Sequence, residues 1–174
     1  MTADPPAISD RIYTVTEYFE IEYASDVRYE YVGGRVLAMS GGTYAHDKIS
    51  TNFVRQLGNR LEGSQCSASG PNLRIRYGRK VNYGYADALV ICGEPKFDLY
   101  RDIDSLNEYV IAWQTVPVVH VITRQPSGGW LLNQFSGMES TAMLTSLNIE
   151  LPLKEIYLGV TFPEPDPDQK SPHW

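Results

Sequence analysis

The stretch RYEYVGGRVLAMSGGTYAHDKIS, residues 28–50, holds the strongest structural signals in the chain. Gly33-Gly34 and Gly41-Gly42 bound the short run RVLAM at residues 35–39, as expected of a strand. Thr43 can then cap a helix that Gly63 ends. Apolar residues recur at every fourth position of this helix: Ala45, Ile49, Phe53, Leu57 and Leu61. The stretch therefore predicts a short strand followed by a long helix.

Upstream of this stretch, the sequence favours an opening helix. Thr14 and Glu17 fit a capping box, in which each residue satisfies a backbone N–H at the helix start. The helix would begin near Val15 and would leave Glu30 close to its end. Glu30 is then either a solvated helix-end glutamate or a carboxylate available to a site.

Downstream, the pattern changes to strands. Residues 73–77 alternate apolar with basic side chains, which predicts a half-exposed strand. Residues 85–92 and 109–113 are more continuously apolar and predict inner strands. Residues 116–123 and 130–135 flank a Pro-Ser-Gly-Gly turn and predict a hairpin.

The order of these elements predicts an α+β domain with one mixed sheet and helices packed on it. Pro152 is suited to the first position of a short helix through Tyr157. We expect a flexible N-terminus over residues 1–12 and one domain over 13–163. The Pro-rich residues 164–174 favour a disordered tail.

Charge is unevenly distributed along the chain. The net charge of −6 argues against indiscriminate nucleic-acid binding. The window from Arg55 to Lys80, however, contains six basic residues and a single acid, Glu62. This window is either a phosphate-facing patch or a solvated face balanced by acids elsewhere.

Cysteine spacing and hydropathy bear on the cellular setting. Cys66 and Cys92 lack CxxC spacing, so we expect two reduced, buried thiols and no zinc cage or disulfide framework. No apolar run approaches the roughly 20 residues of a membrane span, and no signal peptide is evident. These features predict a cytoplasmic protein without a membrane partner.

Two acidic residues are candidates for chemistry. If residues 85–92 form one strand, alternation places Asp87 in an apolar row with Tyr85, Leu89 and Ile91. A carboxylate in such a row needs a cation, a metal ion or several N–H donors. Asp87 is therefore either structural or a metal ligand, and Glu30 could be a second ligand.

His46 and Lys96 are weaker candidates. His46 lies in the first turn of the long helix, where it could contact phosphate or orient a water molecule, although a lone histidine is more often simply packed or exposed. Lys96 could pair with Asp87 if the chain turns at Gly93 and Pro95; the alternative is an exposed lysine in a turn. Motifs for P-loop hydrolases, Rossmann dehydrogenases, serine hydrolases and zincins are absent from the sequence.

Several segments together resemble the Uma-two family of restriction-endonuclease-like proteins, within the wider PD-(D/E)XK nuclease superfamily. They occur in the family's order: YTVTEYFE, RYEYVGGRVLAMSGGTYAHDKIS, YADALVIC, KFDLYRDIDSLNEYVIAWQ, GGWLLNQFSG and LPLKEIYLGVTFPE. The resemblance implies a restriction-endonuclease-like α+β core. It also implies an endonuclease that hydrolyses DNA phosphodiester bonds with Mg²⁺ or Mn²⁺.

The resemblance also implies site residues. Asp87 matches the aspartate of the family's usual PDVVV strand, with Ala86 in place of proline. Glu30 matches the family's helix glutamate, and His46 the histidine of its AHxxI segment. Lys96 matches the lysine of its RGEKF segment. The resemblance therefore predicts Asp87, Lys96, Glu30 and His46 as catalytic residues, with Asp87 and Glu30 as metal ligands.

The chain departs from the family between the aspartate and the lysine. Members normally carry a further central strand there, ending in a glutamate-containing EVLSPST-like motif. Here Cys92-Gly93-Glu94-Pro95 leads almost directly to Lys96. One central strand is thus expected to be missing, and with it a metal-binding carboxylate that Glu94 could replace.

This departure leaves more than one functional hypothesis. The first is an active endonuclease in which Arg74 and Arg76 contact the DNA backbone. The second is a catalytically inactive nuclease-fold protein that binds nucleic acid or a protein partner. The third is a gene product with no retained activity. Because restriction-type nucleases often act as dimers, a homodimer is the candidate assembly.

Overall fold

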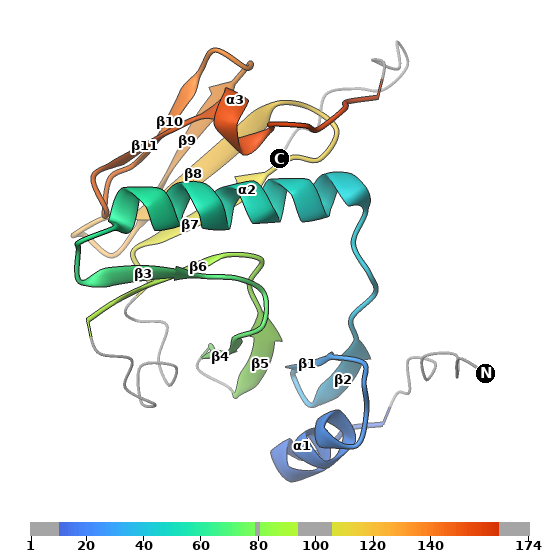
Figure 1. Ribbon diagram of the computed structural model, residues 1–174. Coiled ribbons are helices and arrows are strands. Elements are labelled where there is room, and N and C mark those ends of the chain that lie inside the picture. The colour runs from blue at the N-terminus through green and yellow to red at the C-terminus, as the bar shows by residue number, and fades with distance from the viewer. Residues whose placement is uncertain (1–10, 79–80, 94–105, 164–174) are drawn as a thin grey trace. The chain divides into compact units, whose positions relative to one another are not determined.

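The computed structural model describes residues 11–78, 81–93 and 106–163 (Figure 1). Most of the expected flexible N-terminus and the whole expected tail lie outside these residues. The chain divides into two compact units. The first comprises residues 1–42 and 53–106, and the second comprises residues 43–52 and 107–174.

The first unit opens with helix α1 (Val15–Tyr23), whose N-terminus is a capping box as predicted. The Thr14 hydroxyl accepts the Glu17 N–H at 3.2 Å, and the Glu17 carboxylate accepts the Thr14 N–H at 2.7 Å. The backbone hydrogen bond from Thr14 is the main cause that lowers the pKa of Glu17. The local sequence thus sets where this helix begins.

A hairpin of β1 (Tyr29–Val32) and β2 (Arg35–Ala38) follows. Gly33 and Gly34 connect the strands, and both have positive φ, as a two-residue hairpin turn of type I′ requires. The strand at residues 35–38 was predicted, but its partner β1 was not.

The hairpin belongs to a four-stranded antiparallel sheet in the order β2-β1-β5-β4, with β4 at Arg74–Tyr77 and β5 at Asn82–Tyr85. The strand predicted at residues 73–77 is confirmed as β4. A buried cluster of Tyr18, Tyr29 and Tyr31 packs α1 on one face of this sheet. The core of this part is therefore mainly aromatic.

Helix α2 (Tyr44–Leu61) confirms the four-residue periodicity. Ile49, Phe53, Leu57 and Leu61 are each at most 8% exposed. The helix stops before Gly63, which has a φ of +77°. Strand β3 (Cys66–Ser69) follows and pairs antiparallel with β6 (Leu89–Cys92) as a separate two-stranded ribbon.

The second unit contains a three-stranded antiparallel sheet of β7 (Glu108–Ala112), β8 (Val118–Arg124) and β9 (Trp130–Ser136). The predicted strand at 109–113 and the predicted hairpin are both confirmed. Strands β10 (Thr141–Leu144) and β11 (Ile149–Pro152) pair with each other.

The short helix α3 (Leu153–Ile156) follows β11, with Pro152 at its N-cap, so the helix begins one residue after the predicted start. Leu153, Ile156 and Tyr157 are at most 1% exposed and belong to the core of the second unit. The Tyr157 hydroxyl donates to the Val118 carbonyl oxygen at 2.6 Å. This bond ties the chain after α3 to strand β8.

The α+β class is confirmed, but the expectation of one mixed sheet is wrong for the described strands. They form four sheets, and each pairing is antiparallel. The main reason is that β5 and β6, expected as one strand, have different partners. None of the described helices is both long and apolar enough to span a membrane.

Candidate functional site

Glu30 lies in strand β1, which corrects the expectation that it ends the opening helix. The Gly33-Gly34 turn pairs residues 29–32 with β2, so the chain is extended here. Tyr29 and Tyr31 are 6% and 7% exposed and point into the aromatic core. Because side chains alternate along a strand, Glu30 faces the opposite side of the sheet.

Gly84 of strand β5 makes room for the Glu30 carboxylate. A Cβ atom built on Gly84 would lie 3.0 Å from Glu30 Oε1 and 3.2 Å from Tyr77 Cε1. Both distances are shorter than ordinary van der Waals contact. The pKa of Tyr77 is raised, first by burial and then by the negative charge of Glu30. Glu30 and Tyr77 thus occupy the space above a buried glycine.

We expect Gly84→Ala to lower the free energy of unfolding by about 1–3 kcal/mol, because the new methyl group overpacks this site. Gly58→Ala is the matched control. Gly58 lies in α2 with nothing within 4 Å of its Cβ position, and alanine there should stabilise the helix by about 0.5–1 kcal/mol. Urea denaturation measures both changes. Equal stability of Gly84→Ala and the wild type would show that the glycine is not required.

Asp87 lies in a bend between β5 and β6 and is exposed. This corrects the prediction of a continuous strand with Asp87 in an apolar row. β5 pairs with β1 and β4, whereas β6 pairs with β3, so the chain must change direction between them. The resulting position does not require burial of the charged carboxylate.

His46 lies in the first turn of α2, as predicted, and is half-buried. Its backbone N–H donates to the Thr43 hydroxyl at 3.1 Å, so Thr43 caps this helix as expected. His46 belongs to the second unit, whereas Glu30 and Asp87 belong to the first. Glu94 and Lys96 lie outside the described residues.

Arg74 is held in a cluster that the sequence did not suggest. Its guanidinium carbon lies 4.8 Å from the ring centre of Phe19 and 5.6 Å from that of Tyr23. Its Nη1 atom is 3.8 Å from Oε2 of Glu22, whose side chain is only 8% exposed. Arg76 lies two residues along β4, on the same face, and is half-buried.

Glu22 connects this cluster to strand β5. The Tyr85 hydroxyl donates to Glu22 Oε1. Burial, followed by this hydrogen bond, raises the pKa of Tyr85 to about 12. Burial disfavours the charged form of Arg74, but the Glu22 carboxylate raises the pKa of Arg74 overall. The Arg74 guanidinium therefore interacts with side chains of α1, which makes Arg74 less suitable for contacting DNA. Arg76 is the better candidate for that contact.

The described residues do not form a metal cage by themselves. No group of three or more His, Cys, Asp or Glu side chains is placed to hold a metal ion in this part of the chain. Mg²⁺ sites, however, often use only one or two carboxylates together with water and substrate phosphates. Glu30 and Asp87 would fit that open kind of site if they converge.

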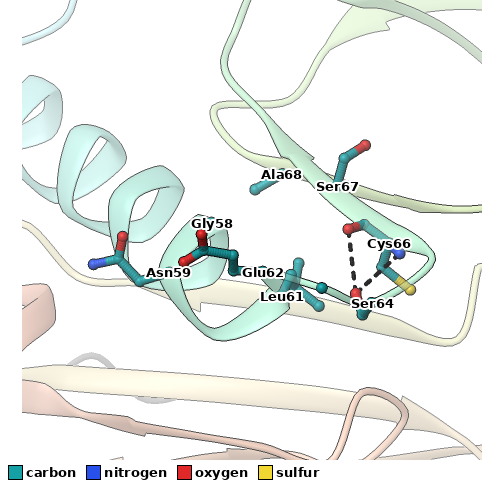
Figure 2. A pocket seen from close by; sticks show the side chains of 9 residues that line it. Gly58, Asn59, Leu61, Glu62, Ser64, Cys66, Ser67 and Ala68 are labelled. Carbon is teal, nitrogen blue, oxygen red and sulfur yellow. Dashed lines mark hydrogen bonds between the residues drawn. The ribbon is translucent and has the colours of Figure 1, made fainter.

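A surface hollow of about 480 Å³ lies elsewhere in the first unit (Figure 2). It is lined by the last turn of α2, the turn at Gly63 and Ser64, and residues 66–68 of β3. Glu62 is the single ionisable side chain among the lining residues. The predicted site residues do not line it, so it is distinct from the candidate site.

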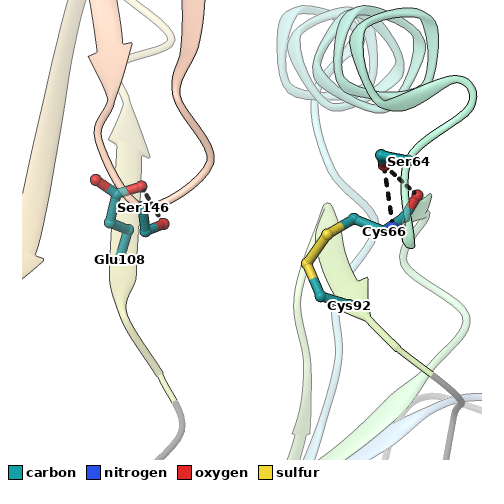
Figure 3. The surroundings of a disulfide bond; sticks show 5 residues. All are labelled: Ser64, Cys66, Cys92, Glu108 and Ser146. Carbon is teal, nitrogen blue, oxygen red and sulfur yellow. Dashed lines mark hydrogen bonds between the residues drawn. A yellow bond between two sulfur atoms is a disulfide. The ribbon is translucent and has the colours of Figure 1, made fainter.

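Cys66 and Cys92 form a disulfide between β3 and β6 (Figure 3). This overturns the expectation of two reduced, buried thiols. Cys92 is exposed and Cys66 is half-buried. The residues are 26 positions apart in the sequence, and strand pairing places them directly opposite each other. Spacing alone could not reveal this pairing.

Comparison with known proteins shows a similarity to one protein family. The Uma2 family profile, described as "Putative restriction endonuclease", matches residues 15–98. The chain is therefore similar to the Uma2 family over 84 of its 174 residues. The matched range contains each residue predicted for the site: Glu30, His46, Arg74, Arg76, Asp87, Glu94 and Lys96.

Two uncharacterised proteins of Synechocystis are similar to this chain. One, slr1290, is 22% identical over 191 positions, with 93% of this chain and all of the relative covered. The other, sll1609, is 26% identical over 102 positions, covering 59% of this chain and 58% of the relative. Because 93% of 174 residues is about 162, the alignment with slr1290 has about 29 positions without a residue here.

A solved structure supports the fold. The chain resembles the crystal structure of a protein from Anabaena variabilis described as a "putative nuclease belonging to DUF820", with a TM-score of 0.60. The match covers 76% of this chain and 91% of the other, at 12% sequence identity. At this identity the similarity shows the fold alone, and it confirms the predicted α+β nuclease-like architecture.

Proposed function

We propose that this protein is a member of the Uma2 family and a divalent-metal-dependent endonuclease that hydrolyses DNA phosphodiester bonds in the cytoplasm. The observation that carries this proposal is the family match over residues 15–98, which contains the complete set of predicted site residues. The nuclease-like fold supports it further. Mg²⁺ or Mn²⁺ would be the cofactor, with DNA as substrate and a homodimer as the working assembly.

Glu30 and Asp87 are the described residues proposed to hold the metal ion, with Glu94 as a third ligand. The Glu30 carboxylate lies against Gly84 of β5. Asp87 follows Gly84 by three residues, so their Cα atoms are at most about 11 Å apart. That separation lets a Glu and an Asp side chain approach one another if both point into the same space.

The remaining residues have supporting roles in this proposal. A bound metal ion would polarise the scissile phosphate and lower the pKa of a coordinated water molecule. Lys96 would stabilise negative charge that develops on the phosphate. His46 would contact phosphate or orient water. Arg76, and Arg74 to a lesser extent, would bind the DNA backbone.

Nicking of supercoiled plasmid tests this proposal. We expect the wild type to nick plasmid with Mg²⁺ or Mn²⁺ but not with EDTA. Asp87→Ala should lower the rate at least about a hundredfold, as expected when an essential charged group is removed. Asp26→Ala, which changes an exposed aspartate before β1, is the matched control and should nick at the wild-type rate. Equal rates for the wild type and Asp87→Ala would contradict the proposal.

A second candidate function is an inactive nuclease-fold protein that binds nucleic acid or a protein partner. Two observations favour it: no three-residue metal-ligand group occurs in the described ranges, and slr1290 has additional positions. Such a protein should bind DNA with an affinity that falls steeply with salt, without metal-dependent nicking. Salt-dependent binding together with intact plasmid would favour this candidate over the first.

A further inference from the structure

The Cys66–Cys92 disulfide joins the two strands of a ribbon (Figure 3). Next to it, the Gly93 N–H donates to the Gln65 carbonyl oxygen at 2.7 Å. In an antiparallel ladder, hydrogen-bonded pairs alternate with pairs that are not hydrogen-bonded. Cys66 and Cys92 therefore form a pair of the second kind, whose side chains are closer together.

The two sulfur atoms differ in access. Cys92, at the end of β6, is exposed, whereas Cys66 is half-buried at the start of β3. Exposed disulfides tend to be the labile and regulatory ones. We propose that Cys66–Cys92 is a reversible redox link that a dithiol reductant opens by attack at Cys92, and that its reduction loosens the β3–β6 ribbon.

The exchange is a two-electron step. A thiolate of the dithiol attacks Cys92 Sγ, forms a mixed disulfide and expels Cys66 as a thiolate, which then takes a proton. The second thiol of the reductant loses its proton and attacks the sulfur atom that the reductant contributes to the mixed disulfide. Cys92 leaves as a thiolate and takes that proton. The reductant ends as a disulfide, and the protein has gained two electrons and two protons.

The ribbon depends on this link because it has little other support. Among the described strands, β3 and β6 pair only with each other, over four residue pairs. None of their eight residues is fully buried. Two-stranded ribbons are marginally stable on their own in water. Opening the disulfide should therefore increase the fluctuations of both strands.

The ribbon is also connected to the candidate site. Asp87 precedes β6 by two residues, and Glu94 follows Cys92 by two. Reduction would thus act on the segment that carries proposed metal ligands. This consequence for cleavage rests on the proposed function, whereas the redox chemistry of the cysteines does not.

Thiol counting under native conditions tests the redox link. The air-oxidised protein should show no free thiol, and incubation with dithiothreitol without denaturant should expose two. On non-reducing electrophoresis the oxidised protein should migrate as a monomer, as expected of a disulfide within one chain. The Cys66→Ser/Cys92→Ser double variant should show no free thiol before or after the dithiothreitol treatment. Two free thiols after oxidation, reduction only in denaturant, or a disulfide between chains would each overturn the proposal.

Amide hydrogen exchange tests the structural consequence separately from activity. Reduction should accelerate exchange at least tenfold in β3 and β6, but leave β8 of the other unit within twofold. The Cys66→Ser/Cys92→Ser protein should behave like the reduced wild type. Unchanged exchange rates in β3 and β6 after reduction would overturn the proposal that the disulfide stabilises the ribbon. This measurement does not depend on whether the protein cleaves DNA.

Discussion

Replacing Tyr18 by alanine is expected to lower the free energy of unfolding by about 3–5 kcal/mol, the range for loss of a buried aromatic side chain. Tyr18 is 0% exposed. Its ring centre lies 5.1 Å from that of Phe19, 5.4 Å from Tyr31 and 5.6 Å from Tyr83. The substitution would empty the space between α1 and the sheet. Urea denaturation followed by circular dichroism measures the loss.

Tyr18→Phe is the matched control for this cavity. It keeps the ring and removes the hydroxyl, which donates to the Tyr29 carbonyl oxygen at 3.1 Å. The expected loss is about 1 kcal/mol, as for one ordinary hydrogen bond. If Tyr18→Ala and Tyr18→Phe lose the same stability, the aromatic packing does not hold α1 in place.

Asn52→Ala is expected to destabilise the second unit by about 2–3 kcal/mol, because it removes the donor to two carbonyl groups, one of which belongs to the buried residue Ile156. Asn52 is 5% exposed. Its Nδ2 group donates to the carbonyl oxygens of Ile156 and Leu158 at 2.8 and 3.0 Å. These carbonyls lie at and just after the end of α3, where the helix cannot supply its own partners.

Asn59→Ala provides the comparison for this change. Asn59 lies seven residues later in α2 and is exposed. Its replacement should change stability by no more than about 0.5 kcal/mol. Thermal denaturation of the two variants measures the difference. Similar melting temperatures for Asn52→Ala and the wild type would be incompatible with a structural role for these bonds.

Local signals in the sequence predicted much of the fold. The capping box at Thr14 defines the start of α1, and apolar periodicity defines α2. The hairpin of β8 and β9 follows from its turn residues. Each of these features depends on residues close together in the chain, so a single sequence contains the necessary information.

Features that depend on distant partners were missed. Residues 85–92 have the composition of one strand, but the chain bends at Asp87 because β5 and β6 join different sheets. Likewise, the disulfide depends on the register of β3 against β6. No local pattern specifies which strands pair across a long sequence separation.

The sequence predicted which residues belong to the candidate site, but it did not predict how their side chains are arranged. Family resemblance selected Glu30 and Asp87, and the matched range contains both. The role of Gly84 beside Glu30 became clear only from the pairing of β1 with β5. The engagement of Arg74 by Glu22 was equally hidden, because α1 and β4 are about 50 residues apart.

The central claim is that Glu30 and Asp87 serve one metal-dependent site. A double-mutant cycle of plasmid nicking rates in Mn²⁺ tests it most directly, using wild type, Glu30→Gln, Asp87→Asn and the double variant. If both carboxylates hold the same ion, each single variant should lose most of the activity and the double variant little more. A double variant whose fold-loss of activity equals the product of the two single losses would contradict this claim. Nicking at the wild-type rate by either single variant would also contradict it.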